Sequence, residues 1–294
     1  MEWENFRRSE NVEDRRGDSQ YADAGGGGGR GLGIGAIVVL GVIGWALGID
    51  PRLLIGGAEM FHSATKGSQT QQAPSRPAGT PTDQMGQFVA AVLAENEDVW
   101  TDILPSQAGV NYVKPKLVLY SGSTRSACGG ASAAMGPFYC PNDQKVYLDT
   151  SFFRDMKEKL GGGGDFAYAY VISHEIGHHV QNLLGILPKV QAAQARASSK
   201  AEANALSVRI ELMADCLAGV WAANAQKRNQ MLQPGDFEKA VNTAQAIGDD
   251  RLQSQAQGYA VPDSFTHGSS AQRVQWLNTG FKSGEVNACN TFAR

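Results

Sequence analysis

The pattern of apolar and polar positions changes three times along the 294 residues. Residues 1–30 are polar, carry mixed charge and end in the run Gly25–Gly29, which predicts a disordered tail with too little apolar surface to bury. Residues 31–49 carry no charge. Residues 50–85 are interpreted as a linker, because 63–85 are rich in Ser, Thr, Gln, Pro and Gly without periodicity. The folded domain is therefore expected over 86–294.

The apolar run predicts a single transmembrane helix. Nineteen residues (31–49) at ~1.5 Å each nearly cross a hydrocarbon layer of ~30 Å. A cleaved signal peptide is the alternative, because arginines precede the run. The run is longer than a usual signal-peptide core, however, and no clean A-x-A site follows it. We therefore expect an uncleaved anchor in the cytoplasmic membrane.

The cysteines indicate the orientation of this anchor better than the few flanking lysines and arginines do. All four follow the apolar run, and an even number on one side is typical of an oxidising compartment. The sequence thus predicts a cytoplasmic N-terminus and an extracytoplasmic, periplasmic domain.

Within the domain, the periodicity predicts an α+β fold that is mainly helical with a small sheet. Residues 86–98 form an amphipathic pattern, and a second long helix is expected over 201–226. The segments KLVLY (116–120) and KVYLD (145–149) are typical of short strands. The stretch DFAYAYVISHEIGHHVQNLLG predicts one helix, with Asp165 as its N-cap and Gly185 as its stop.

Composition adds one exclusion. The chain is 42% hydrophobic and 19% charged, which is ordinary for a globular protein, and its net charge is −3. There is no basic stripe and no interleaving of aromatic and basic residues, so we do not expect a nucleic-acid partner.

The segment HEIGHH (174–179) contains three of the five histidines. On a helix, His174 and His178 share a face, so both imidazoles can bind one Zn²⁺ while Glu175 lies beside them. A carboxylate next to a zinc-activated water can accept its proton, which is the H-E-x-x-H logic of a metallopeptidase.

The simpler interpretation of this motif is a pair of helix histidines satisfied by polar neighbours, and it predicts no third ligand. The segment RIELMADC (209–216) instead supplies Glu211 and Asp215, four residues apart and set among apolar residues. Glu211 can complete the zinc site, and Asp215 can accept the free ring N–H of a ligand histidine. A solvated acidic face is the alternative.

From about residue 110 onward the chain resembles the bacterial neutral zinc metallopeptidases of the YpfJ type. The segments that carry the resemblance are GPFYCPNDQKVYLD, DFAYAYVISHEIGHHVQ, ELMADC, GDD and SFTHGSSAQRVQW. The resemblance implies a zincin-like, specifically gluzincin-like, fold and a metallopeptidase activity. It implies no particular substrate.

The remaining histidines differ in their expected roles. His179 points about 100° away from His178 around the helix and is interpreted as structural or exposed, and His62 is interpreted as solvated. His267 lies six residues before Arg273, a spacing similar to that of the late histidine and arginine of membrane-associated gluzincins. That similarity implies that His267 steadies the oxyanion and that Arg273 supports the site. A core or capping histidine is the alternative.

Two further segments have both a functional and a structural interpretation. The strand KVYLD, with the preceding GPFYCP, is the candidate edge strand for an extended substrate, or simply a strand that covers the helix. Asp249 and Asp250 are interpreted as a solvated turn rather than a cation site.

The spacing of the cysteines favours two disulfides. Cys128 and Cys140 flank a glycine-rich loop, which leaves Cys216 to pair with Cys289. A buried free thiol at Cys216 is the alternative.

The function we expect is that of a membrane-anchored zinc peptidase. His174, His178 and Glu211 bind the metal, Glu175 is the general base, Asp215 and Arg273 support the site, and His267 binds the oxyanion. The expected substrate is a protein or peptide of the cell envelope. Two alternatives stay open: a catalytically silent envelope binding or assembly protein, and a zinc amidase that acts on cell-wall peptides.

Overall fold

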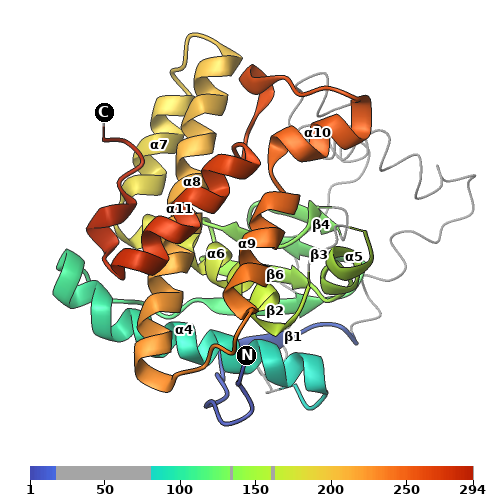
Figure 1. Cartoon of the computed structure of the whole chain (residues 1–294), viewed down its shortest axis with the longest axis vertical. Helices are drawn as coiled ribbons and strands as arrows, with labels where there is room; N and C mark the ends of the chain where they lie inside the picture. Colours follow the sequence, from blue (N-terminus) through green and yellow to red (C-terminus); the bar gives the residue numbers. More distant parts are fainter. Residues whose placement is uncertain (18–80, 133–134, 160–162, 294) are drawn as a thin grey trace, which may run out of the picture.

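The computed structural model describes residues 1–17, 81–132, 135–159 and 163–293 (Figure 1). The strands are β1 (Val12–Asp14), β2 (Lys116–Tyr120), β3 (Ser123–Ser126), β4 (Gly129–Ser132), β5 (Phe138–Cys140) and β6 (Lys145–Asp149). The α-helices are α4 (Gln84–Ala108), α5 (Ser151–Lys159), α6 (Asp165–Leu183), α7 (Ile186–Gln194), α8 (Lys200–Asn229), α9 (Asp236–Ala246), α10 (Asp249–Gln257) and α11 (Ser270–Ser283), and the 3-10 turns are η3 (Pro262–Ser264) and η4 (Val286–Cys289). The predicted α+β class, mainly helical with a small sheet, is confirmed.

The main sheet has the strand order β1-β2-β6-β5. Strands β1, β2 and β6 are parallel, and β5 runs antiparallel to β6 at one edge. The two strands predicted at 116–120 and 145–149 have these bounds in the structure. KVYLD (β6) is nevertheless an interior strand, so the expectation of a substrate-binding edge is wrong for it. Among the described strands the edge is β5 (Phe138–Cys140), which lies in the GPFYCP segment of the same prediction.

Alternating side chains give this sheet two different faces, as the two-residue period of a strand requires. Leu117, Leu119, Val146 and Leu148 face the main core with α4 and α6. Val118, Tyr120 and Tyr147 face a second cluster, which includes Ala131 of the β3–β4 hairpin. The helix that carries HEIGHH therefore packs on one apolar face of the sheet, and the hairpin covers the other.

The first seventeen residues belong to this fold. Trp3 and Val12 are 7% and 0% exposed, and β1 forms the edge of the sheet opposite β5. Burying one such side chain stabilises a fold by ~1.5–3 kcal/mol. The prediction of a disordered tail is thus wrong for residues 1–17. The prediction failed because isolated apolar residues such as Trp3 and Val12 show no periodicity within a polar segment, although each of them fills a buried position in the domain.

The long helices exceed their predicted bounds at several ends. Helix α4 continues through Pro105 to Ala108, ten residues beyond the amphipathic stretch that predicted it, and the left-handed Gly109 caps it. Helix α6 starts at Asp165 with Gly164 in the cap position, and Gly185 separates it from α7. A Cβ on Gly280 would lie 1.9 Å from the Cys216 carbonyl oxygen, so glycine allows α11 to cross α8 at close range.

Among residues 1–17 and the described parts of 81–293, no helix is long and apolar enough to span a membrane. The predicted transmembrane helix (31–49), His62 and most of the predicted linker lie outside the described residues.

Candidate metal centre

Helices α6 and α8 together form one cluster of metal-binding side chains. His174 and His178 lie one turn apart on α6, and Glu211 faces them from α8. One donor atom from each of the three lies within 4.8 Å of the others. His174 Nε2 is 3.0 Å and His178 Nε2 is 3.5 Å from the Glu211 carboxylate. Two imidazole nitrogens and a carboxylate form a donor set that fits a catalytic zinc with an open position.

Asp215 fixes the orientation of His174. It is fully buried, and its Oδ1 lies 2.8 Å from His174 Nδ1. A carboxylate accepts, so Nδ1 carries the proton and Nε2 offers its lone pair to a cation. Asp215 also accepts hydrogen bonds from the Tyr170 hydroxyl (2.6 Å) and from Arg273 Nε and Nη2 (both 2.9 Å). The predicted supporting residues Asp215 and Arg273 are therefore bonded to each other, and Asp215 is bonded to His174.

Burial and charge act in opposite directions on this pair. Burial alone lowers the pKa of His174, but the Asp215 and Glu211 carboxylates outweigh it and raise that pKa to about 10. Burial raises the pKa of Asp215, whereas Arg273 and His174 outweigh burial and lower it to about 2. A cation that binds His174 must therefore displace the proton on Nε2, while the proton on Nδ1 stays with Asp215.

Gln181 does for His178 what Asp215 does for His174. Its Oε1 lies 3.0 Å from His178 Nδ1, and its Nε2 donates to the Ile210 carbonyl at 2.7 Å. The second bond fixes the amide so that Oε1 accepts from Nδ1–H, which leaves Nε2 of His178 for the metal. Because Ile210 precedes Glu211, the same amide also ties α6 to the turn that presents the third ligand.

Gly177, between the two ligand histidines, permits this contact between helices. A Cβ there would lie 3.1 Å from the Ala214 carbonyl oxygen on α8. Glycine costs a helix interior ~1 kcal/mol relative to alanine. The close crossing that results brings Glu211 and Asp215 within reach of α6.

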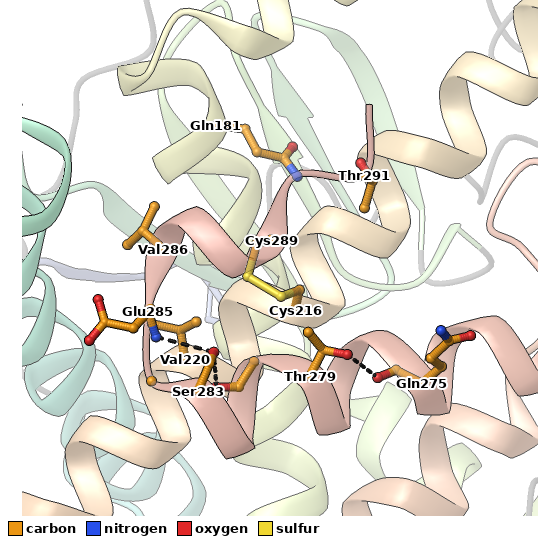
Figure 2. The surroundings of a disulfide bond; sticks show 12 residues. Gln181, Cys216, Val220, Gln275, Thr279, Ser283, Glu285, Val286, Cys289 and Thr291 are labelled. Atoms are coloured by element: carbon orange, nitrogen blue, oxygen red, sulfur yellow. Dashed lines mark hydrogen bonds between the residues drawn. A yellow bond between two sulfur atoms is a disulfide. The ribbon is translucent and has the colours of Figure 1, made fainter. Parts of the chain in front are cut away.

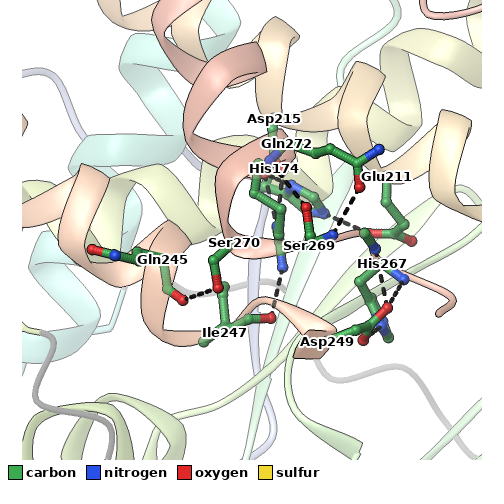
Figure 3. Close-up of polar contacts among 12 residues, drawn as sticks. His174, Glu211, Asp215, Gln245, Ile247, Asp249, His267, Ser269, Ser270 and Gln272 are labelled. Atoms are coloured by element: carbon green, nitrogen blue, oxygen red, sulfur yellow. Dashed lines mark hydrogen bonds and ion pairs between the residues drawn. The ribbon is translucent and has the colours of Figure 1, made fainter. Parts of the chain in front are cut away.

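His267 lies beside this cluster and is held by Asp249 (Figure 3). The Asp249 carboxylate accepts from the backbone N–H groups of Thr266 (2.7 Å), His267 (2.6 Å) and Gly268 (3.0 Å), and from His267 Nδ1 at 3.2 Å. Asp249 is 1% exposed, so the prediction of a solvated turn is wrong for it. The His267 side chain is half-exposed, and among the described residues its Nε2 has no hydrogen-bond partner.

Asp250 plays a different part in the same motif. Its Oδ1 accepts from the backbone N–H (2.7 Å) and hydroxyl (2.8 Å) of Ser270, the first residue of α11. The two adjacent carboxylates thus hold neighbouring parts of one segment: Asp249 holds His267, and Asp250 holds the start of the helix that carries Arg273.

Disulfides hold the surrounding elements. Both predicted pairs, Cys128–Cys140 and Cys216–Cys289, are disulfides in the structure, so Cys216 is not a free thiol. Figure 2 shows the C-terminal segment fastened to α8 by Cys216 and Cys289. Beyond the disulfide, the Thr291 hydroxyl donates to the Arg209 carbonyl at 2.7 Å. The C-terminal segment therefore supports the turn of α8 that precedes Glu211.

His179 is structural, in keeping with its predicted separation from the metal. Its Nε2 donates to the Val113 carbonyl (2.6 Å), so its Nδ1 accepts from the Tyr139 hydroxyl (3.0 Å). Burial lowers the pKa of His179, which favours this neutral form. Since Asn182 Nδ2 also donates to Tyr139, the edge strand β5 is bonded directly to the helix of the metal ligands.

Sequence reasoning missed Tyr170, Gln181 and the role of Asp249. Tyr170 lies four residues before His174, and Gln181 lies three after His178, so helical spacing alone places each beside its histidine. No comparable signal exists for Asp249, because its partners lie seventeen to nineteen residues away in a loop.

Comparison with known proteins agrees with this geometry. Residues 1–292 match the family model described as "Putative neutral zinc metallopeptidase". The chain belongs to this family. Among relatives, the uncharacterized protein YpfJ of Escherichia coli K12 is 48% identical over 297 residues, covering all of this chain and 99% of its own. The uncharacterized protein Mb2605 of Mycobacterium bovis is 44% identical over 206 residues, or 66% of each chain. No solved structure matches.

Proposed function

We propose that this protein is a zinc-dependent peptidase that hydrolyses peptide bonds with Glu175 as the general base. The observation that carries the proposal is the convergence of His174, His178 and Glu211, with each histidine oriented through its second nitrogen. A structural zinc site has four protein ligands and needs no base, whereas this cluster offers three ligands with Glu175 next to one of them.

When bound, the metal lowers the pKa of a water molecule and polarises the substrate carbonyl. Glu175 follows His174 on α6 and is 8% exposed, so its carboxylate is largely shielded from bulk solvent. In the proposed reaction it accepts a proton from the attacking water and then donates that proton to the departing amine.

His267 is the proposed donor to the carbonyl oxygen as negative charge develops there. Its Nδ1–H is held by Asp249, which leaves Nε2 directed to other partners. Burial lowers the pKa of His267, but the Asp249 and Glu211 carboxylates outweigh burial and raise it. Asp249 is thereby a positioning residue, because it acts through His267.

The edge strand β5 is the proposed docking site for the substrate backbone. Its inner side pairs with β6, and Tyr139 bonds it to α6 beside the metal ligands. An extended peptide that adds to the other side gains main-chain hydrogen bonds, which favours unfolded or extended segments as substrates.

We also propose that the protein acts in the cell envelope, on a protein or peptide substrate outside the cytoplasm. Two disulfides within one domain support an oxidising compartment.

The test uses the full-length chain with three glutamate variants. Glu175→Gln should retain zinc at about one equivalent and lose hydrolysis of an unfolded protein substrate by ~10²-fold or more, because it removes only the base. Glu211→Ala should lose the zinc itself. Glu238→Gln, at an exposed position on α9, should change neither quantity.

Equal zinc loss in Glu175→Gln and Glu211→Ala would contradict the separate roles. A zinc-loaded wild-type protein that cleaves only cell-wall peptides would indicate the amidase, and one that cleaves neither substrate would indicate the binding protein.

A further inference from the structure

Residues 1–17, the N-terminal segment, are joined to the metal-binding domain by backbone hydrogen bonds along their length. Ser9 N donates to the Ala90 carbonyl at 3.0 Å, and Leu117 N donates to the Asn11 carbonyl at 2.9 Å. Strand β1 then pairs with β2 in parallel register, Val12 opposite Leu117. Parallel strands need a crossover, and α4 lies between β1 and β2 in the chain. The N-terminal segment therefore supplies the first strand, β1, of a β-α-β unit.

Side chains of the N-terminal segment fill polar as well as apolar sites. Trp3 packs edge-on against Phe88 at 5.3 Å between ring centroids, and its Nε1 donates to Asp165, the first residue of α6. Glu97 on α4 is 0% exposed and accepts from the Ser9 hydroxyl (2.6 Å) and Asn11 Nδ2 (2.7 Å). Without the segment, a buried carboxylate and the start of the metal-binding helix would lose these partners.

The described residues that flank positions 18–80 contact each other. Arg16 lies just before the stretch and Asp83 just after it, and Arg16 Nη1 donates to Asp83 Oδ1 at 3.0 Å. Asp83 also caps α4 by accepting from Gly86 N. A single crossing by residues 31–49 would place these two side chains on opposite sides of a ~30 Å hydrocarbon layer.

We propose that the N-terminal segment and the metal-binding domain fold together in one compartment, on the same side of any membrane. This differs from the arrangement predicted from the sequence, in which a single crossing separates a cytoplasmic N-terminus from the domain. The docking of the N-terminal segment does not depend on whether the protein is a peptidase.

Single-cysteine variants of the full-length protein test it. The four native cysteines are all in disulfides, so an added thiol is the only reactive one once the domain is oxidised. Glu10→Cys reports on the N-terminal segment and Ser106→Cys on the end of α4, and both positions are exposed. Intact spheroplasts and lysed cells are treated with a membrane-impermeant maleimide.

The proposal expects the two variants to behave alike. Labelling of both before lysis supports one compartment outside the cytoplasm. Labelling of both only after lysis, and above that of the chain without an added cysteine, also supports one compartment, and it contradicts the extracytoplasmic placement. Labelling of one before and the other only after lysis would overturn the proposal.

A second measurement asks whether the N-terminal segment is docked in the protein as it exists. Trp3→Ala in the full chain should lower the melting temperature, whereas Asn5→Ala, at an exposed neighbouring position, should leave it unchanged. Equal melting temperatures for Trp3→Ala and the wild-type chain would contradict the docking and with it the single compartment.

Discussion

At the scale of single residues, Asp249 provides the sharpest test of the site. Asp249→Asn should lower kcat while KM and zinc content stay unchanged, because the change weakens the hydrogen bonds that hold His267 and its neighbours Thr266 and Gly268. The loss should be smaller than the ~10²–10³-fold expected when His267→Ala removes an oxyanion donor. Asp250→Asn is the matched control, since its bonds go to Ser270 and not to His267. Steady-state kinetics should show that Asp249→Asn and His267→Ala are not additive.

A second prediction at this scale concerns Asp215. Removing its carboxylate leaves Arg273 buried without its partner, so Asp215→Ala should lower the free energy of unfolding by ~3–5 kcal/mol. Zinc affinity should fall ~10–100-fold, because His174 loses its orienting acceptor. Tyr170→Phe removes one hydrogen bond to the same carboxylate and should cost only ~1 kcal/mol. Denaturant unfolding and zinc titration separate the two effects.

The pKa of Asp215 gives the same carboxylate a pH dependence. Its pKa is lowered from 3.8 to about 2 in the fold. The stability that it contributes is therefore fully present above about 3.8 and is lost as the pH falls through about 2. In Asp215→Ala the free energy of unfolding should depend less steeply on pH in this acidic range. An unchanged dependence in the variant would show that other carboxylates control acid unfolding.

At the scale of elements, the crossing of α6 and α8 decides whether the ligands meet. Gly177→Ala adds a methyl group 3.1 Å from the Ala214 carbonyl oxygen and should push the helices apart. Overpacking costs ~1–3 kcal/mol, which a gain of ~1 kcal/mol in helix propensity partly offsets. Zinc affinity should therefore fall more clearly than stability. Gly17→Ala, where a Cβ meets nothing within 4 Å, is the control in zinc titration and thermal unfolding.

At the scale of the whole molecule, the two disulfides differ in the length of chain they close. Cys216–Cys289 spans 73 residues and Cys128–Cys140 spans 12. On the chain-entropy model the longer loop contributes ~4 kcal/mol and the shorter ~3 kcal/mol. The double variant Cys216→Ala/Cys289→Ala should thus be the less stable and should also bind zinc more weakly, because the C-terminal segment supports α8 near Glu211. Equal zinc affinity in both double variants would show that this support does not reach the site.

The local features of this protein can be predicted from its sequence. The strands β2 and β6, the helices around HEIGHH and RIELMADC, and the spacing of His174, Glu175 and His178 all follow from periodicity and helical geometry, which act over a few residues. The pairing of α6 with α8 could also be inferred, because a third zinc ligand on α8, Glu211, must lie close to the two histidines on α6. Other features depend on long-range contacts and become visible only in the folded protein. Strand β1, the burial of Asp249 and the edge position of β5 depend on contacts between segments far apart in the chain, and such contacts leave no period in the sequence.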